Sequence, residues 1–264
     1  MDISLSGLLI GYFLSIVILA IHQLKKTGLS KKYGISLVRM TLQLFFLGLV
    51  LQWIMDTRNI PVLAVLTLLM LLAATQLIVG GSGVSYRKFF LMIFTVSSLS
   101  TLAAGGVLLF GVIGLPLKEW NNPRYIIPIL GMLLGNTMNS GVISLRNLEQ
   151  SIKSQRKIIE QKLSYGAKPT EAVLKYIREA YKLALLPHIS SMAGMGVVSL
   201  PGMMTGQVLS GTDVMTAVKY QIAIVLGITA VAAVSNYILL HYAHKKYFNP
   251  REQMLGVESG KKSN

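Results

Sequence analysis

The sequence contains no cysteine, so it can form no disulfide, no thiolate metal site and no cysteine nucleophile. It is also poor in charge, because only 13% of its 264 residues are Asp, Glu, Lys or Arg, against about 25% in a typical soluble domain. No G-x-x-x-x-G-K-[ST] phosphate loop occurs, and the glycine-rich stretch at residues 80–83 lacks the lysine and the spacing of one. We therefore expect no enzyme activity and no cofactor in this chain.

Apolar residues make up 53% of the chain and fall in blocks of about 20. A helix that rises about 1.5 Å per residue needs about this length to cross some 30 Å of hydrocarbon. The sequence thus predicts an all-α fold, a polytopic transmembrane helix bundle of about seven spans within one domain, residues 1–264. The expected spans are residues 5–22, 35–54, 60–79, 89–112, 125–145, 187–209 and 219–242.

The basic residues are distributed unevenly between the loops. Twenty of the 25 Lys and Arg residues lie in alternate loops and in the C-terminal tail, at 23–34, 80–88, 146–186 and 243–264. The positive-inside rule then predicts a cytoplasmic C-terminus and an external N-terminus, in a multi-pass protein of the cell membrane. The net charge of +15 is explained by this topology and by contact with the lipid bilayer, so nucleic-acid binding is not expected.

Few polar side chains lie inside the expected spans. The absence of Asp and Glu from them weakens a secondary-carrier interpretation, because ion-coupled sites commonly use such groups. Arg39 lies about 7 Å into the second span, where it either extends its side chain to the surface or contacts an anion or the backbone. Gln43, one turn deeper, is expected on the same polar face.

The fifth span contains the densest polar cluster. Asn136 lies about 16 Å into it, near the midplane, and shares one helical face with Asn139 and Ser140. Two interpretations stay open. These side chains either make hydrogen bonds between helices, or they line a polar translocation path.

The sixth span contains a proline about 21 Å into the bilayer. Pro201 and Gly202 predict a break of the helix, and broken helices at membrane depth often mark binding sites. Met203 and Met204, with Gln207, follow the break as candidate cargo contacts. Methionine is more often flexible packing than a metal ligand, so the two thioethers, and His188 at the membrane edge, are weak metal candidates.

The long polar segment 146–186 predicts a helix that continues out of the membrane, a stop, and a second helix at about 169–184. Gly166 suits a C-terminal cap and Pro169 suits a first turn. The second helix is amphipathic, so we expect it either to lie on the membrane surface or to contact a partner.

Three stretches together resemble a known family: GMLLGNTMNSG at 131–141, KLSYGAKPTEA at 162–172 and VVSLPGMMTGQ at 197–207. They are similar to the FetB-like ABC transporter permeases, which include a bacterial iron-export permease and a plant aluminium-sensitive permease. The resemblance implies a homodimeric permease that exports iron, a related metal or its chelate. It also implies two copies of a separate ATPase subunit, which would hold ATP and Mg.

The segment 146–186 is also similar to the loop through which ABC importers contact their ATPase. The resemblance implies a coupling role for seven residues, Glu160, Gly166, Ala167, Pro169, Glu171, Ala172 and Tyr176. The alternatives are an ABC importer of a metal or small solute, an ATP-independent channel or secondary carrier, and a membrane scaffold that transports nothing.

Overall fold

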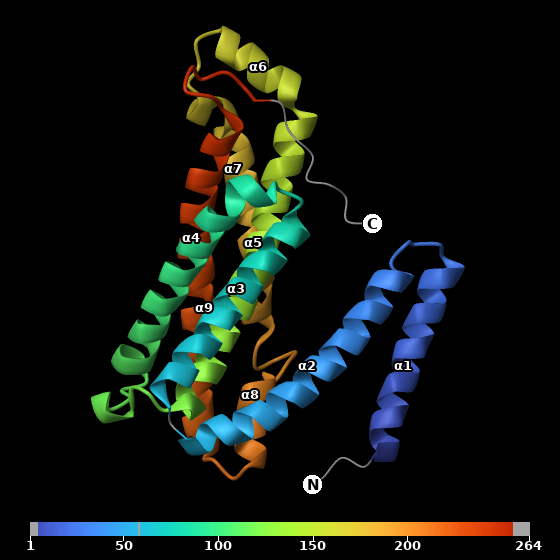
Figure 1. Cartoon of the computed structure of the whole chain (residues 1–264), viewed down its shortest axis with the longest axis vertical. Helices are drawn as coiled ribbons and strands as arrows, with labels where there is room; N and C mark the ends of the chain where they lie inside the picture. Colours follow the sequence, from blue (N-terminus) through green and yellow to red (C-terminus); the bar gives the residue numbers. More distant parts are fainter. Residues whose placement is uncertain (1–4, 58, 256–264) are drawn as a thin grey trace. The chain divides into compact units, whose positions relative to one another are not determined.

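The computed structural model describes residues 5–57 and 59–255, which are almost entirely helical (Figure 1). The chain divides into two compact units, Met1–Thr57 and Arg58–Asn264. Six helices of the described residues are long and apolar enough to cross a membrane, as expected for a multi-pass membrane protein.

The first unit is a hairpin of two long helices, α1 (Leu5–Leu24) and α2 (Ser30–Thr57). The hydroxyl groups of Tyr12 and Thr41 lie 2.6 Å apart and join the two helices. Most of the leucine, isoleucine and phenylalanine side chains in both helices are exposed, as expected for surfaces that meet lipid or other protein. The first two predicted spans are confirmed as helices.

The second unit is built around α5, which packs against the four other long helices of the unit. Its long helices are α3 (Ile60–Ser82), α4 (Tyr86–Gly106), α5 (Pro123–Ser154), α7 (Pro169–Gly194) and α9 (Val214–Ala243). Shorter elements connect or extend them: a π-helix (Val107–Val112), α6 (Arg156–Ser164), α8 (Gly202–Leu209) and 3-10 turns at Leu117–Glu119 and His244–Tyr247.

The largest apolar core lies at the end of the bundle that carries α6, where α5, α7 and α9 meet (Figure 1). Ile152 of α5 and Val173 of α7 are fully buried there, as are the small side chains of Ala172 and Ala243. Alanine permits close approach of the helix backbones, so α7 and α9 can approach closely at this end.

The region between residues 169 and 209 differs from the predicted elements. The sequence predicts one helix to about residue 184 and a new span from Pro187, but α7 runs without interruption through Pro187 to Gly194. The predicted span 187–209 is therefore not one helix: it consists of the last turns of α7, a non-helical segment at 195–201, and α8. Pro187 is tolerated because a proline removes only one hydrogen bond of a long helix.

Candidate functional site

The break in the predicted sixth span lies at residues 195–201. The backbone of Gly196 has a φ of +82°, a left-handed conformation that favours glycine and ends α7. The backbone amides of Val198 and Ser199 donate to the Gly194 carbonyl over 2.9 and 3.2 Å. Pro201 caps α8, and Gly202 is its first residue. The helix therefore ends at Gly194, seven positions before Pro201.

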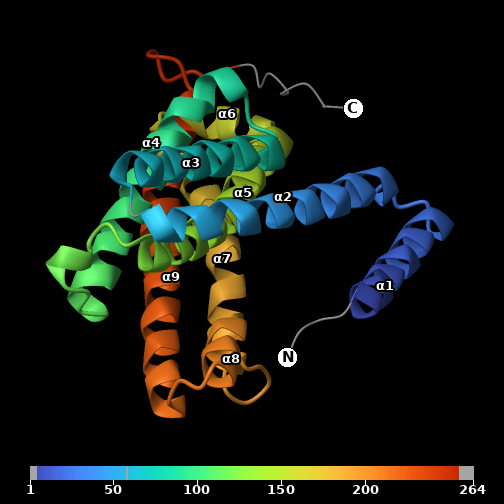
Figure 2. The same ribbon diagram turned by 60° about the horizontal axis from the view of Figure 1, so that its bottom comes forward.

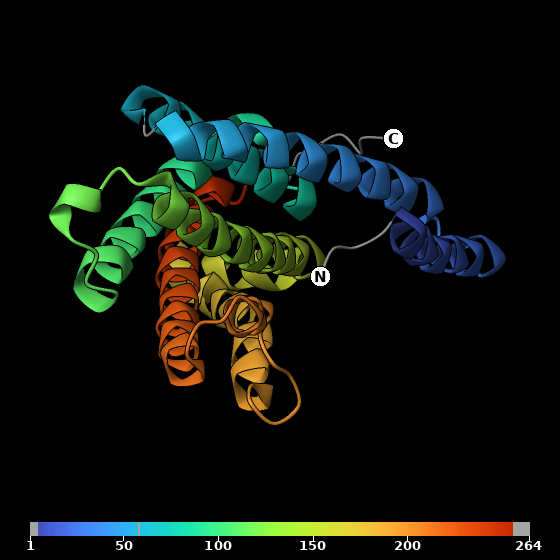
Figure 3. The ribbon, with the colours of Figure 1, turned by 90° about the horizontal axis from the view of Figure 1, so that it is seen from below.

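The break segment is largely uncovered. It bows out between α7 and α8 when the molecule is seen from below (Figure 3), and Val197 is 91% exposed. Among the described residues, the backbone carbonyls of Gly196, Val197 and Val198 accept no hydrogen bond. Unpaired backbone groups are costly in hydrocarbon, so this segment requires protein or a water-filled cavity beside it.

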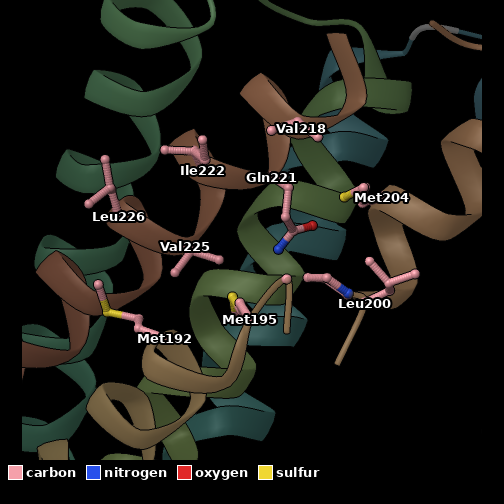
Figure 4. A pocket seen from close by; sticks show the side chains of 11 residues that line it. Met192, Met195, Leu200, Met204, Val218, Gln221, Ile222, Val225 and Leu226 are labelled. Carbon is pink, nitrogen blue, oxygen red and sulfur yellow. The ribbon is translucent and has the colours of Figure 1, made fainter. Parts of the chain in front are cut away.

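A pocket of about 340 Å³ lies beside the break, between the end of α7, α8 and α9 (Figure 4). The thioethers of Met192, Met195 and Met204 line it together with several aliphatic side chains from α9. In the close-up, the three sulfur atoms lie at separate positions around the pocket and do not converge on one point. The arrangement therefore fits an apolar or chelated solute better than a bare cation held by three thioethers.

Gln221 is the one polar side chain among the residues that line this pocket. The Oε1 atom of Gln221 is buried and has no hydrogen-bond partner among the described residues. The hydroxyl of Thr229, two turns further along α9, donates to the Met192 sulfur over 3.3 Å. An unpaired buried amide oxygen is an available acceptor for a ligand that carries an N–H or O–H group.

The predicted polar face of α5 divides into two environments. Ser140 is buried between α5 and α9, where its hydroxyl accepts a hydrogen bond of 2.8 Å from the Asn236 amide. Asn136 is half-buried and donates to the Met132 carbonyl of its own helix over 2.8 Å, whereas Asn139 is exposed. Ser140 thus contributes to helix packing, and the two asparagines border an open face of α5.

The other predicted path residues are scattered. Met203 is half-buried but does not line the pocket that Met204 lines. Gln207 has a buried Oε1 atom without a partner among the described residues. Arg39 and Gln43 are exposed on α2, in the first unit.

The predicted coupling residues, which lie between Glu160 and Tyr176, form a compact helix–turn–helix, called the coupling element below. Gly166 has a φ of +87°, and the Gly166 and Ala167 amides donate to the carbonyls of Leu163 and Lys162 over 3.0 and 3.1 Å. These two bonds are those of a Schellman motif, which ends α6. Pro169 then opens α7, and the Glu171 carboxylate accepts a bond of 3.1 Å from the Lys168 amide.

The apolar stripe of α7 is not free to contact lipid headgroups or another protein. Ala172, Tyr176 and Ala180 are buried in the core formed with α5 and α9. Burial and the nearby Glu179 carboxylate raise the pKa of Tyr176 above its usual value. The expectation that this stripe lies on the membrane surface or contacts a partner is therefore wrong for these three residues, because the long helices of this chain cover them. The turn itself stays open, with Tyr165 81% exposed and Glu160 paired to Arg156 over 2.8 Å.

Known proteins resemble the chain along almost its whole length. A model of an uncharacterised protein family, UPF0014, matches residues 5–248. The chain belongs to the UPF0014 family. This agrees with the resemblance carried by residues 131–141, 162–172 and 197–207, and no solved structure matches the chain.

Three relatives of this UPF0014 chain illustrate the sequence identity and coverage of the matches. The probable iron export permease protein FetB of Escherichia coli is 31% identical over 99% of the chain and 98% of the relative. The UPF0014 membrane protein slr1647 of Synechocystis is 34% identical over 93% and 95%. The protein ALUMINUM SENSITIVE 3 of Arabidopsis thaliana is 30% identical over 83% and 78%.

Two polar residues of the UPF0014 chain that sequence reasoning missed are central to its packing. Asn236, fully buried in α9, accepts from the Ser144 hydroxyl over 2.6 Å in addition to its bond with Ser140. Glu149 of α5 is buried, and it accepts a hydrogen bond from Tyr247 and pairs with Lys153 over 2.7 Å. Within residues 5–57 and 59–255, no three His, Asp or Glu side chains are placed to hold a metal ion together.

Proposed function

We propose that this chain is the membrane subunit of an ABC transporter that exports iron, a related metal or its chelate. Membership of UPF0014 and the printed name of the Escherichia coli relative support the transporter class, the cargo and the direction. ATP and Mg would be bound by a separate ATPase subunit, since the sequence has no phosphate loop. In this orientation the end of the bundle that carries α6 is cytoplasmic.

The observation that carries the proposal is the exposed turn between α6 and α7. Its two helices are anchored by buried side chains, Ile159 of α6 and Val173 of α7, so the turn is held by the core formed by α5, α7 and α9. An ATPase that contacts Tyr165 and Gly166 would therefore move these helices as a unit. A mobile surface loop could not transmit such a movement.

A second copy of the chain would complete the site. The segment 195–201 has unpaired carbonyls at membrane depth, and the pocket beside it is open on one side. A symmetric dimer places like polar groups, including those near Asn136 and Asn139, opposite one another.

Transport would then use the break as the moving part. Hydrolysis by two ATPase copies would tilt α5, α7 and α9 at the coupling end, and the non-helical segment 195–201 would absorb the change in direction between α7 and α8. Cargo would pass the pocket at Met195, Met204 and Gln221. Contacts from thioethers and one amide are weak, which suits an exporter that must release its cargo.

The proposal requires a separate Walker-motif ATPase subunit, and binding of that subunit to this chain tests it. Tyr165→Ala alters only an exposed side chain in the turn, and we expect it to weaken ATPase binding by roughly tenfold, about 1.4 kcal/mol. Tyr242→Ala, half-exposed at the end of α9, serves as the matched control and should bind normally. Equal binding of both variants and the unmodified chain would remove the coupling assignment.

A further inference from the structure

Two polar contacts, one half-buried and one buried, join the start of α7 and the central helix α5 to the end of α9. At the start of α7, the hydroxyl of Thr170 lies 3.3 Å from Nε2 of His244, at the end of α9. The His244 Nδ1 atom lies 3.2 Å from the Leu240 carbonyl and donates to it, so Nε2 of the neutral ring accepts from Thr170. The second contact is the hydrogen bond from Tyr247 to the Glu149 carboxylate of α5.

Tyr247 is the point at which several parts of the chain meet. Its hydroxyl binds α5, its ring lies 5.7 Å from that of Phe89 in α4, and its carbonyl accepts from the Leu255 amide over 2.8 Å. His244, three positions earlier in the chain, contacts Thr170 of α7. The short 3-10 turn His244–Tyr247 therefore connects α4, α5, α7 and α9 at the end that carries the coupling element (Figure 1).

Glu149 is a charged residue in a buried position on α5, which is unusual. It is buried, and a buried carboxylate is costly unless it is paired and hydrogen-bonded. Lys153, on the next turn of α5, and the Tyr247 hydroxyl provide those partners. A phenylalanine and a leucine would stabilise the core at least as well, whereas the polar pair fixes one relative orientation of α5 and the 3-10 turn.

We propose that the pairs Thr170–His244 and Tyr247–Glu149 form a polar latch that holds the coupling element in register with α5 and α9. The four side chains are positioning residues, and none of them contacts cargo. The role of the latch in transport rests on the proposed function, but its hold on α7 does not. When the latch is intact, movement of the α6–α7 turn is passed fully to α5 and α9; without it, the apolar core alone passes on a smaller part of that movement.

The latch is tested with the full chain in lipid nanodiscs and with its ATPase partner. The variant combines Tyr247→Phe, which keeps the ring, with Thr170→Val, which keeps the shape. Tyr242→Phe is the matched control, because it removes a hydroxyl from a half-exposed tyrosine five residues away. Two quantities are measured: amide hydrogen exchange at residues 169–176 without the ATPase, and the number of ferrous ions transported per ATP hydrolysed.

We expect the double variant to exchange roughly tenfold faster at residues 169–176, to bind the ATPase normally, and to move severalfold fewer ferrous ions per ATP. Unchanged exchange would overturn the latch. Faster exchange with an unchanged transport ratio would reduce it to ordinary packing and would also overturn it. If the unmodified complex transports no ferrous iron, the proposed function fails, and the exchange measurement alone then decides whether the two pairs hold α7.

Discussion

The side-chain amide of Asn236 in α9 donates to the hydroxyl of Ser140 in α5 over 2.8 Å, and both residues are buried. Its carbonyl accepts from Ser144, one turn along α5, over 2.6 Å. One asparagine therefore joins two turns of the central helix to α9. Apolar helices gain nothing from leaving lipid for one another, so such hydrogen bonds give the pair a specific register.

Replacement of this asparagine should destabilise the second unit. We expect Asn236→Leu to lower the free energy of unfolding by about 1–2 kcal/mol, because Ser140 and Ser144 lose their shared partner. The measurement is denaturation of the purified chain in detergent, followed by loss of helix signal. Asn139→Leu, an exposed asparagine on α5, is the control and should change the value by less than about 0.5 kcal/mol.

The close approach of α3 and α5 depends on one glycine. A Cβ atom added at Gly81 would lie 2.9 Å from Cγ1 of Val142, a β-branched side chain that has little freedom to move. We expect Gly81→Ala to cost about 1–3 kcal/mol and Val142→Ala in the same chain to recover part of that loss. Gly80→Ala, where the added atom meets nothing within 4 Å, should be neutral or slightly stabilising. Equal effects at both glycines would contradict this account.

The turn between α6 and α7 depends on a left-handed residue. Gly166→Ala should destabilise it by about 1 kcal/mol, because alanine disfavours the φ of +87° observed there. Limited trypsin digestion after Lys162 measures the opening, which we expect to be severalfold faster. Gly166→Asn is the informative comparison, since asparagine tolerates this conformation and should digest at nearly the normal rate.

The pocket beside the break predicts separate effects for neighbouring methionines. Met204→Ile changes a side chain that lines the pocket, whereas Met203→Ile changes the preceding, half-buried methionine outside it. We expect only Met204→Ile to lower the rate of ferrous iron transport, by roughly threefold to tenfold, with both variants folding normally. Transport rates are compared in proteoliposomes at equal permease content. Equal losses would show that the pocket does not contact the cargo.

The sequence predicts the apolar helices well because hydrophobic length is a strong local signal. The break is harder to place. Pro201 marks its far edge, but the helix ends at Gly194 because the left-handed Gly196 follows it. Pro187 gives a false boundary, since the helix around it continues to pack through Ala180 and Ala184.

The buried polar contacts could not be predicted, because they join residues far apart in the chain. In the sequence, Glu149 is one of several charged residues in a polar segment. In the fold, Tyr247, 98 residues later, covers it and donates a hydrogen bond to it. In the sequence, Asn236 is a polar residue in an apolar span with no indicated partner. The fold brings Ser140 and Ser144 of α5 within hydrogen-bond distance of it. Gly166 was predictable as a helix cap because its turn is made by neighbours in sequence.

The central proposal is ATP-driven export through this chain, and transport in inside-out proteoliposomes that contain the chain and its ATPase partner tests it most directly. We predict that ferrous iron accumulates inside the vesicles only when ATP, Mg and the ATPase are all present, and that Tyr165→Ala reduces the rate by roughly tenfold. Accumulation that proceeds equally well without the ATPase or without ATP would contradict the account and identify a channel or secondary carrier instead.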